Sequence, residues 1–190
     1  MSPRVPKAEF DGPVEEMVER FGAVPEPIEV MWHNPAVAMA AAEFGAKVGE
    51  WNAADESLKS LAHMAVSAQV GCSWCLDFGY FMAQNQKLDL AKASQVPRWR
   101  EATVFTPLEL QVMAYAEAMT HTPPTVTDEM TEGLLEELGP KAMVELTAFI
   151  GFANFSTRSN VSLGIESQGF SADCEVPLAS RPEAASPVAS

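Results

Sequence analysis

The sequence is short of basic residues, of cysteine and of long apolar runs, and each shortage removes a class of protein. Its 12 lysines and arginines stand against 26 aspartates and glutamates, so the formal net charge is −14. That charge argues against partners such as nucleic acid or an anionic membrane surface. No apolar run has the length of about 18 residues that a membrane-spanning helix needs, so we expect no such helix.

The N-terminal residues and the few cysteines indicate a compartment. The chain begins Met-Ser-Pro-Arg-Val-Pro-Lys, without the apolar segment of a secretory signal peptide. Three cysteines without such a signal predict a cytoplasmic protein in a reducing environment. A Cys-x-x-Cys pair in that environment is more often catalytic than structural.

Helical patterns cover nearly the whole chain, and no stretch shows the alternation of a β-strand. A chain of 190 residues, 47% of them hydrophobic, is enough for one domain with a proper core. We therefore predict an all-α helical bundle at residues 13–170. A flexible N-terminal arm is expected at 1–12. A disordered tail rich in Pro, Ala and Ser is expected at 171–190.

Local start and stop signals divide this domain into helices. Gly71 separates a helix predicted at 55–69 from one that begins near Cys72 and ends near Gln86. Thr106-Pro-Leu-Glu109 combines an N-cap, a proline at the first helical position and a capping-box glutamate. Further helices are predicted at 13–21, 35–50, 89–95, 107–120, 127–139 and 140–163. The segments 55–86 and 140–165 are the most apolar and are expected to form the core.

The segment Cys72-Ser-Trp-Cys75 carries the strongest chemical signal. Two thiols three residues apart at a helix start can close a disulfide, and a helix N-terminus stabilises a thiolate. Two alternatives compete with a redox pair. A structural zinc ion needs four ligands, and neither Cys174 nor His33, His63 and His121 form a second paired motif. Two inert thiols buried in a core remain the other alternative.

Several further motifs follow one another in a set order. They are His33-Asn-Pro35, an alanine-rich stretch, Gly71-Cys72-x-x-Cys75, Thr106-Pro-Leu-Glu109, Ala114-Tyr-Ala-Glu-Ala118, and Val144-Glu-Leu-Thr-Ala-Phe-Ile-Gly151 with Asn154. From about residue 25 to residue 168 this order resembles the carboxymuconolactone decarboxylase family, which includes the alkylhydroperoxidase D-like proteins. The resemblance implies an all-helical subunit that packs into homotrimers or homohexamers.

The resemblance also implies roles for the cysteines. In the alkylhydroperoxidase D-like proteins the second cysteine attacks a peroxide and the first closes a disulfide, so Cys75 would attack and Cys72 would resolve. Those proteins relay protons through a glutamate and a histidine. The corresponding positions here are Ser60 and Gly79, so both relay residues are absent from their expected places.

Other residues are weighed as replacements for this relay. His63 lies one helical turn after Ser60 and is our candidate acid or base. Asp77 is expected to be a surface charge, and Glu56 to suit the dipole of its helix. Trp74 is expected to pack rather than to line a pocket. Near the end of the last helix, beside Asn160, Arg158 is expected to pair with a carboxylate.

Three functions remain open at this point. The first is a thiol-dependent oxidoreductase, a peroxidase or disulfide reductase that uses Cys75, Cys72 and His63, with a thiol electron donor of unknown identity. The second is a lactone decarboxylase that does not need the cysteine pair. The third is a non-enzymatic helical oligomer with inert cysteines. We favour the first, and we expect no cofactor and no metal.

Overall fold

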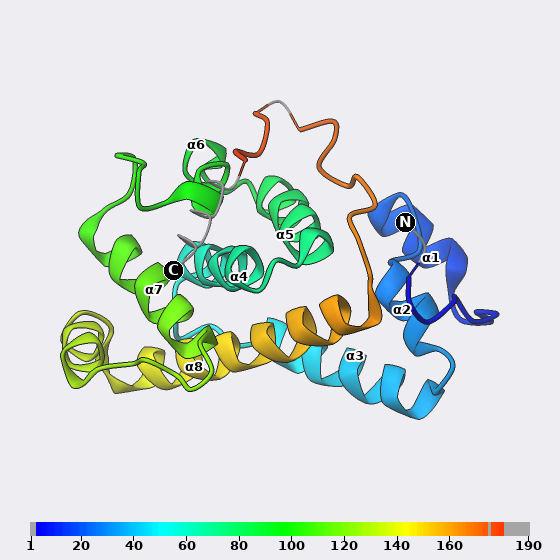
Figure 1. The fold of residues 1–190 in the computed structure, drawn as a ribbon, viewed down its shortest axis with the longest axis horizontal. Helices are drawn as coiled ribbons and strands as arrows, with labels where there is room; N and C mark the ends of the chain where they lie inside the picture. The colour runs from blue at the N-terminus through cyan, green and yellow to red at the C-terminus, as the bar shows by residue number, and fades with distance from the viewer. Residues whose placement is uncertain (1–2, 175, 181–190) are drawn as a thin grey trace, which may run out of the picture.

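The computed structural model describes residues 3–174 and 176–180, and within them every regular element is helical (Figure 1). The predicted all-α fold is therefore confirmed. The elements are α1 (Val14–Phe21), α2 (Glu26–Met31), α3 (Pro35–Gly49), α4 (Glu56–Val70), α5 (Ser73–Asn85), α6 (Leu90–Ala93), the short 3₁₀ helix η1 (Val96–Arg98), α7 (Pro107–Thr120) and α8 (Asp128–Leu163).

Local signals place the helix ends where the sequence indicates them. Gly71 ends α4 with φ 80°, a left-handed conformation that glycine adopts without strain. The capping box of α7 forms, because Thr106 accepts from the backbone N–H of Glu109 and the Glu109 carboxylate accepts from that of Thr106. The two helices predicted at 127–139 and 140–163 run on from one another as the single element α8. A kink at Gly139, which has φ 72°, marks the predicted boundary between them. The short helix α2 was not predicted.

Helix α4 lies at the centre of the bundle, packed between α5, α7 and α8 (Figure 1). Its buried residues join one large apolar core with residues of α7 and α8. The members of that core on the last two helices include Val112, Met113, Tyr115, Ala116, Leu134, Leu146 and Ile150. Both segments expected to form the core, 55–86 and 140–165, contribute to it, and the structure adds α7. None of the helices in the described ranges is long and apolar enough to cross a membrane.

A buried charge pair joins the connection between α3 and α4 to α8. Lys59 is 1% exposed, and its Nζ donates to the carbonyl of Trp51 at 2.6 Å and lies 3.5 Å from Glu145 Oε1. Glu145 in turn accepts from the backbone N–H groups of Ala53 at 2.7 Å and Ala54 at 3.1 Å. A buried ammonium is stable only when it is paired in this way. Sequence pattern gave no sign of this pair.

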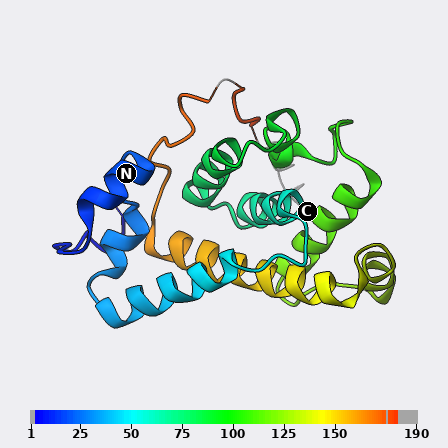
Figure 2. The ribbon, with the colours of Figure 1, turned by 180° about the vertical axis from the view of Figure 1, so that it is seen from behind.

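The two ends of the described chain lie against the helices. Near the N-terminus, Arg4 donates from its backbone to the carbonyl of Leu163, at the end of α8. After α8, residues 164–174 pass α1 and α2 and turn back over α5, and residues 176–180 lie near α6, as the two opposite views show (Figures 1 and 2). There Val176 accepts from the hydroxyl of Tyr80 at 2.6 Å. Of the tail predicted to be disordered from residue 171, residues 175 and 181–190 lie outside the described part.

Candidate functional site

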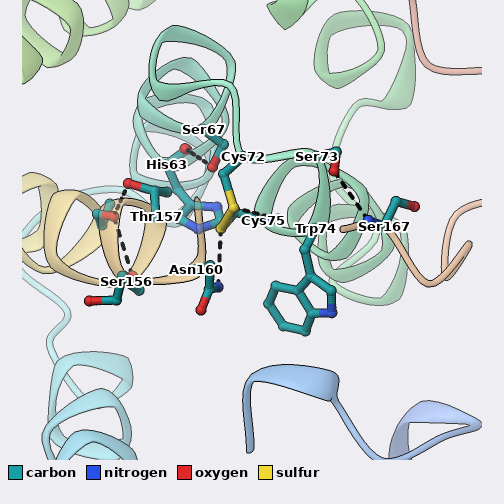
Figure 3. Close-up of a disulfide and its surroundings, with 12 residues drawn as sticks. His63, Ser67, Cys72, Ser73, Trp74, Cys75, Ser156, Thr157, Asn160 and Ser167 are labelled. Atoms are coloured by element: carbon teal, nitrogen blue, oxygen red, sulfur yellow. Dashed lines mark hydrogen bonds between the residues drawn. A yellow bond between two sulfur atoms is a disulfide. The ribbon is translucent and has the colours of Figure 1, made fainter. Parts of the chain in front are cut away.

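The cysteine pair lies at the turn between α4 and α5, beside the end of α8 (Figure 3). Cys72 is the N-cap of α5, and its sulfur accepts from the backbone N–H of Cys75 at 3.2 Å. The two sulfur atoms form a disulfide, with the Cα atoms 5.3 Å apart. The helix start that the sequence predicts near Cys72 thus brings the two thiols within bonding distance.

The disulfide is almost completely buried. Cys72 is 1% exposed and Cys75 2%. Together with Val30 of α2, Trp74 and Ile165 they form a second apolar cluster, separate from the main core. Partly buried residues surround it, namely Val5, Phe78, Val161, Leu163 and Phe170. Residues from the segment before α1 and from the segment after α8 therefore help to cover the cysteine pair.

His63 reaches the same region from α4 (Figure 3). A side chain added at Gly79 would place its Cβ 2.8 Å from Nδ1 of His63 and 3.1 Å from its Cε1. Gly79 lies one helical turn after Cys75, on the same side of α5. The imidazole of His63 therefore occupies the space beside Cys75 that a side chain at position 79 would need. A histidine is present beside the pair, but it comes from the preceding helix.

Burial determines the protonation of this histidine. Removal from water disfavours the imidazolium and lowers the pKa of His63 to about 4. At neutral pH the ring is therefore uncharged and has a lone pair that can accept a proton. The uncharged ring can accept the proton of a thiol, but the lowered pKa makes it a weaker base than a solvent-exposed histidine.

Glu56 and Ser60, near the start of α4, have different surroundings. Glu56 forms an ion pair with Lys59, with an Nζ–Oε2 distance of 3.0 Å, and accepts from Gln86 at 3.3 Å. Ser60, at the position of the expected glutamate, is partly buried. Of the two residues of α4 weighed as replacements for the relay, His63 lies beside the cysteine pair and Glu56 forms a partly exposed ion pair.

Asp77 is buried, which corrects the expectation of a surface charge. It is 6% exposed and accepts from the hydroxyl and backbone groups of the segment after α8. The donors are Ser167 Oγ at 2.7 Å, Gly169 N at 2.8 Å, Phe170 N at 3.0 Å, Ser171 N at 2.8 Å and Ser171 Oγ at 2.6 Å. Burial would raise the pKa of Asp77, but hydrogen bonds from Ser171 and Ser167 outweigh it and hold that pKa below its usual value. Asp77 therefore anchors residues 167–171 to α5.

Trp74 packs, as expected, and points away from the sulfur atoms (Figure 3). Its ring stacks on Phe78 with 4.7 Å between centroids. Its Nε1 donates to Gln168 Oε1 at 2.7 Å. Gln168 Oε1 also accepts from the backbone N–H of Glu26 at 2.7 Å. The tryptophan thus links α5 to both the segment after α8 and the start of α2.

Two residues at the end of α8 differ in role. The expectation that Arg158 pairs with a carboxylate is not met among the described residues: its guanidinium donates to the carbonyl of Thr120, to Thr122 Oγ1 and to Asn154 Oδ1. Asn160 is buried and donates to the sulfur of Cys75 at 3.4 Å. Sequence reasoning assigned no role to Asn160, because 85 residues separate it from Cys75.

The third cysteine lies on another side of α5. Cys174 donates to Gln84 Oε1 and is partly buried. Burial, followed by the carboxylates of Asp77 and Asp173, raises the pKa of the Cys174 thiol. A raised pKa leaves this cysteine mostly protonated and weakly nucleophilic at neutral pH.

These features define an all-helical protein with a buried Cys-x-x-Cys disulfide at a helix start. The model of the Carboxymuconolactone decarboxylase family matches residues 35–118 of this chain. The uncharacterized protein YnjA of Escherichia coli (strain K12) is 32% identical over 123 residues. That match covers 65% of this chain and 66% of the relative.

Solved structures share the fold. An alkylhydroperoxidase AhpD core, an uncharacterized peroxidase-related protein from Ralstonia eutropha JMP134, superposes with a TM-score of 0.79 at 19% identity, covering 93% of this chain and 98% of that one. The debrominase Bmp8, solved in complex with 2,3,4-tribromopyrrole, gives 0.73 at 20% identity, covering 83% and 84%. At these identities the likeness establishes the fold alone.

Proposed function

We propose that the protein is a thiol-dependent oxidoreductase, a peroxidase or disulfide reductase, that works through Cys75, Cys72 and His63. The observation that carries this proposal is the disulfide between two buried cysteines with an uncharged histidine beside them. We propose the cytoplasm as its location, since a reducing compartment returns the pair to the thiol form.

In the proposed peroxidase cycle, His63 takes the proton of the Cys75 thiol. The thiolate attacks the O–O bond of a hydroperoxide, and the departing alkoxide takes the proton from His63. The products are a sulfenic acid on Cys75 and an alcohol. The Cys72 thiol then attacks this sulfenic acid, which forms the disulfide and releases water. Two thiols of an external donor reduce the disulfide and are themselves oxidised to a disulfide.

As a disulfide reductase the same pair needs no peroxide. The Cys75 thiolate attacks a substrate disulfide, forms a mixed disulfide and releases one thiol. Cys72 then attacks the Cys75 sulfur and releases the second thiol. Oxidation by either substrate leaves the Cys72–Cys75 disulfide described above. The two activities therefore differ only in the substrate that is reduced.

The first test is a thiol count after a brief pulse of cumene hydroperoxide on the reduced Cys174→Ser protein. We expect the loss of two thiols per chain. Cys75→Ser in the same background should lose none, and Cys72→Ser should stop at a sulfenic acid that dimedone traps. Two thiols that stay free through pulses of hydroperoxide and of a small disulfide would refute the proposal. Two comparison substrates are included. Turnover of a carboxylated muconolactone by a variant that lacks both cysteines would favour the decarboxylase alternative. The other substrate is 2,3,4-tribromopyrrole, which the debrominase Bmp8 binds.

We also propose that the subunit assembles into homotrimers or homohexamers through α3. This helix is apolar along most of its length, yet Val37, Met39 and Phe44 are more than one-third exposed, with Met39 at 57%. With Phe155 of α8, Val37 and Phe44 line an open groove of about 420 Å³. Exposed apolar surface of this kind is typical of protein interfaces.

The oligomer proposal predicts a change in mass. Phe44→Glu places a charge in the groove and should reduce the assembly to monomers in light scattering after size-exclusion chromatography. The control Glu43→Gln alters an exposed neighbour that pairs with Lys47 and should leave the mass unchanged. A wild-type protein that is monomeric at micromolar concentration would contradict the proposal.

A further inference from the structure

Asn160 is the one polar side chain of α8 that donates to the disulfide within the described residues. It is 3% exposed, and its Nδ2 lies 3.4 Å from Cys75 Sγ (Figure 3). A disulfide sulfur has no proton to donate, so the amide must present its N–H to the sulfur. A polar amide in an apolar cluster is costly to bury unless it is hydrogen-bonded.

The backbone around Asn160 holds this amide in place. Its carbonyl accepts from the N–H groups of Gly164 and Ile165, which closes the end of α8. Ile165 belongs to the same apolar cluster as the disulfide. The side chain of Asn160 therefore approaches Cys75 from a well-packed helix end rather than from a loop.

The two sulfur atoms receive different donors. Cys72 Sγ accepts from the backbone N–H of Cys75, at the N-terminus of α5. This contact favours negative charge on Cys72 once the disulfide is reduced. Cys75 Sγ accepts from Asn160. In the reduced pair the two sulfurs compete for one negative charge, and a hydrogen bond to an ionised group is stronger than one to a neutral group.

We propose that Asn160 gives Cys75 the role of attacking thiolate by donating its amide N–H to the Cys75 sulfur. The inference rests on the proposed function for its consequence in catalysis. Without this donor, the helix N-terminus would leave the charge on Cys72, and the order of attack and resolution would reverse. Asn160 touches the reacting sulfur, so its effect can be read from the reactivity of Cys75 as well as from stability.

The test compares the two cysteines directly in the reduced Cys174→Ser protein. The protein is partly alkylated with iodoacetamide at several pH values from 5 to 9, and mass spectrometry gives the alkylation rate of each cysteine. We expect Cys75 to react first. Asn160→Leu, of similar size but without a donor, should slow Cys75 by about tenfold at pH 7, move its pH profile upward and shift labelling toward Cys72. Asn160→Asp, which has the same shape, should have the same effect through charge repulsion.

Thr157→Val is the matched control on the same helix. Thr157 is fully buried, and its hydroxyl donates to the carbonyl of Ala153 instead of to sulfur. It should cost stability and leave the labelling ratio unchanged. An unchanged ratio in folded Asn160→Leu or Asn160→Asp would overturn the inference.

A second measurement does not depend on how the variants of Asn160 fold. Cys72→Ser and Cys75→Ser, each with Cys174→Ser, leave one thiol whose ionisation is followed by thiolate absorbance. Cys75 should ionise at the lower pH, and earlier ionisation of Cys72 would refute the inference. Because neither measurement uses a peroxide or a disulfide substrate, thiols that stay free through both pulses would sink the proposed function and leave the role of Asn160 standing.

Discussion

Replacing Asp77 with alanine is expected to lower the free energy of unfolding by about 3 kcal/mol, because the N–H and O–H donors of residues 167–171 lose the buried carboxylate that accepts from them. The same change should release the segment that includes Ile165 and Phe170 from the disulfide cluster. Reduction of the Cys72–Cys75 disulfide by dithiothreitol should then be several-fold faster, since the sulfurs become accessible. Urea unfolding measures the change in stability. Titration of the free thiols at timed intervals after dithiothreitol is added measures the rate of reduction.

The control for this prediction is Asp173→Ala. Asp173 is exposed and lies in the same segment, four residues after Gly169. Its removal changes the net charge by the same amount and should alter neither stability nor the reduction rate. If Asp77→Ala behaved like this control, the anchoring role assigned to Asp77 would be wrong.

The second large effect concerns pH and His63. In the unfolded chain a histidine has a pKa near 6.5, whereas burial lowers the pKa of His63 to about 4 in the folded protein. Above pH 6.5 both states are uncharged and the residue contributes no pH dependence. Between pH 6.5 and 4 only the unfolded chain binds the proton, so stability falls as pH falls. Between pH 7 and 5 this linkage amounts to about 2 kcal/mol.

His63→Gln removes this contribution. The wild-type protein should lose about 2 kcal/mol more than His63→Gln between pH 7 and 5, in urea unfolding at each pH. The wild type and His63→Gln have the same aspartates and glutamates, so the contribution of those residues to the pH dependence cancels in the difference. His121→Gln, at an exposed position, should keep the wild-type dependence. Equal losses in wild type and His63→Gln would show that the imidazole is not held uncharged.

The helices were predictable because their signals are local. Capping at Thr106, proline at position 107, the left-handed glycine at 71 and the break at Gly139 act within one or two turns of the chain. Helix α2 was missed, because it is short and its buried Val30 packs against residues that are distant in the sequence. Its six residues are too few for a periodic pattern.

The cysteine pair was also predictable, because two thiols three residues apart at a helix start can meet. The residues that surround the pair were not predictable from the sequence. That Asp77 is buried follows from the path of residues 167–171, which lie 90 to 94 positions away along the chain. Asn160 and Cys75 likewise meet only because α8 ends beside α5.

By itself, the sequence determined that the chain is helical, where most helices begin and end, and that two cysteines share one turn. These properties depend on backbone capping and on contacts within a few residues. Tertiary structure alone decided that His63 fills the space beside Gly79, that Asn160 donates to Cys75 and that Asp77 is an anchor. Those outcomes depend on which helix faces pack together, and packing joins residues that no local pattern relates.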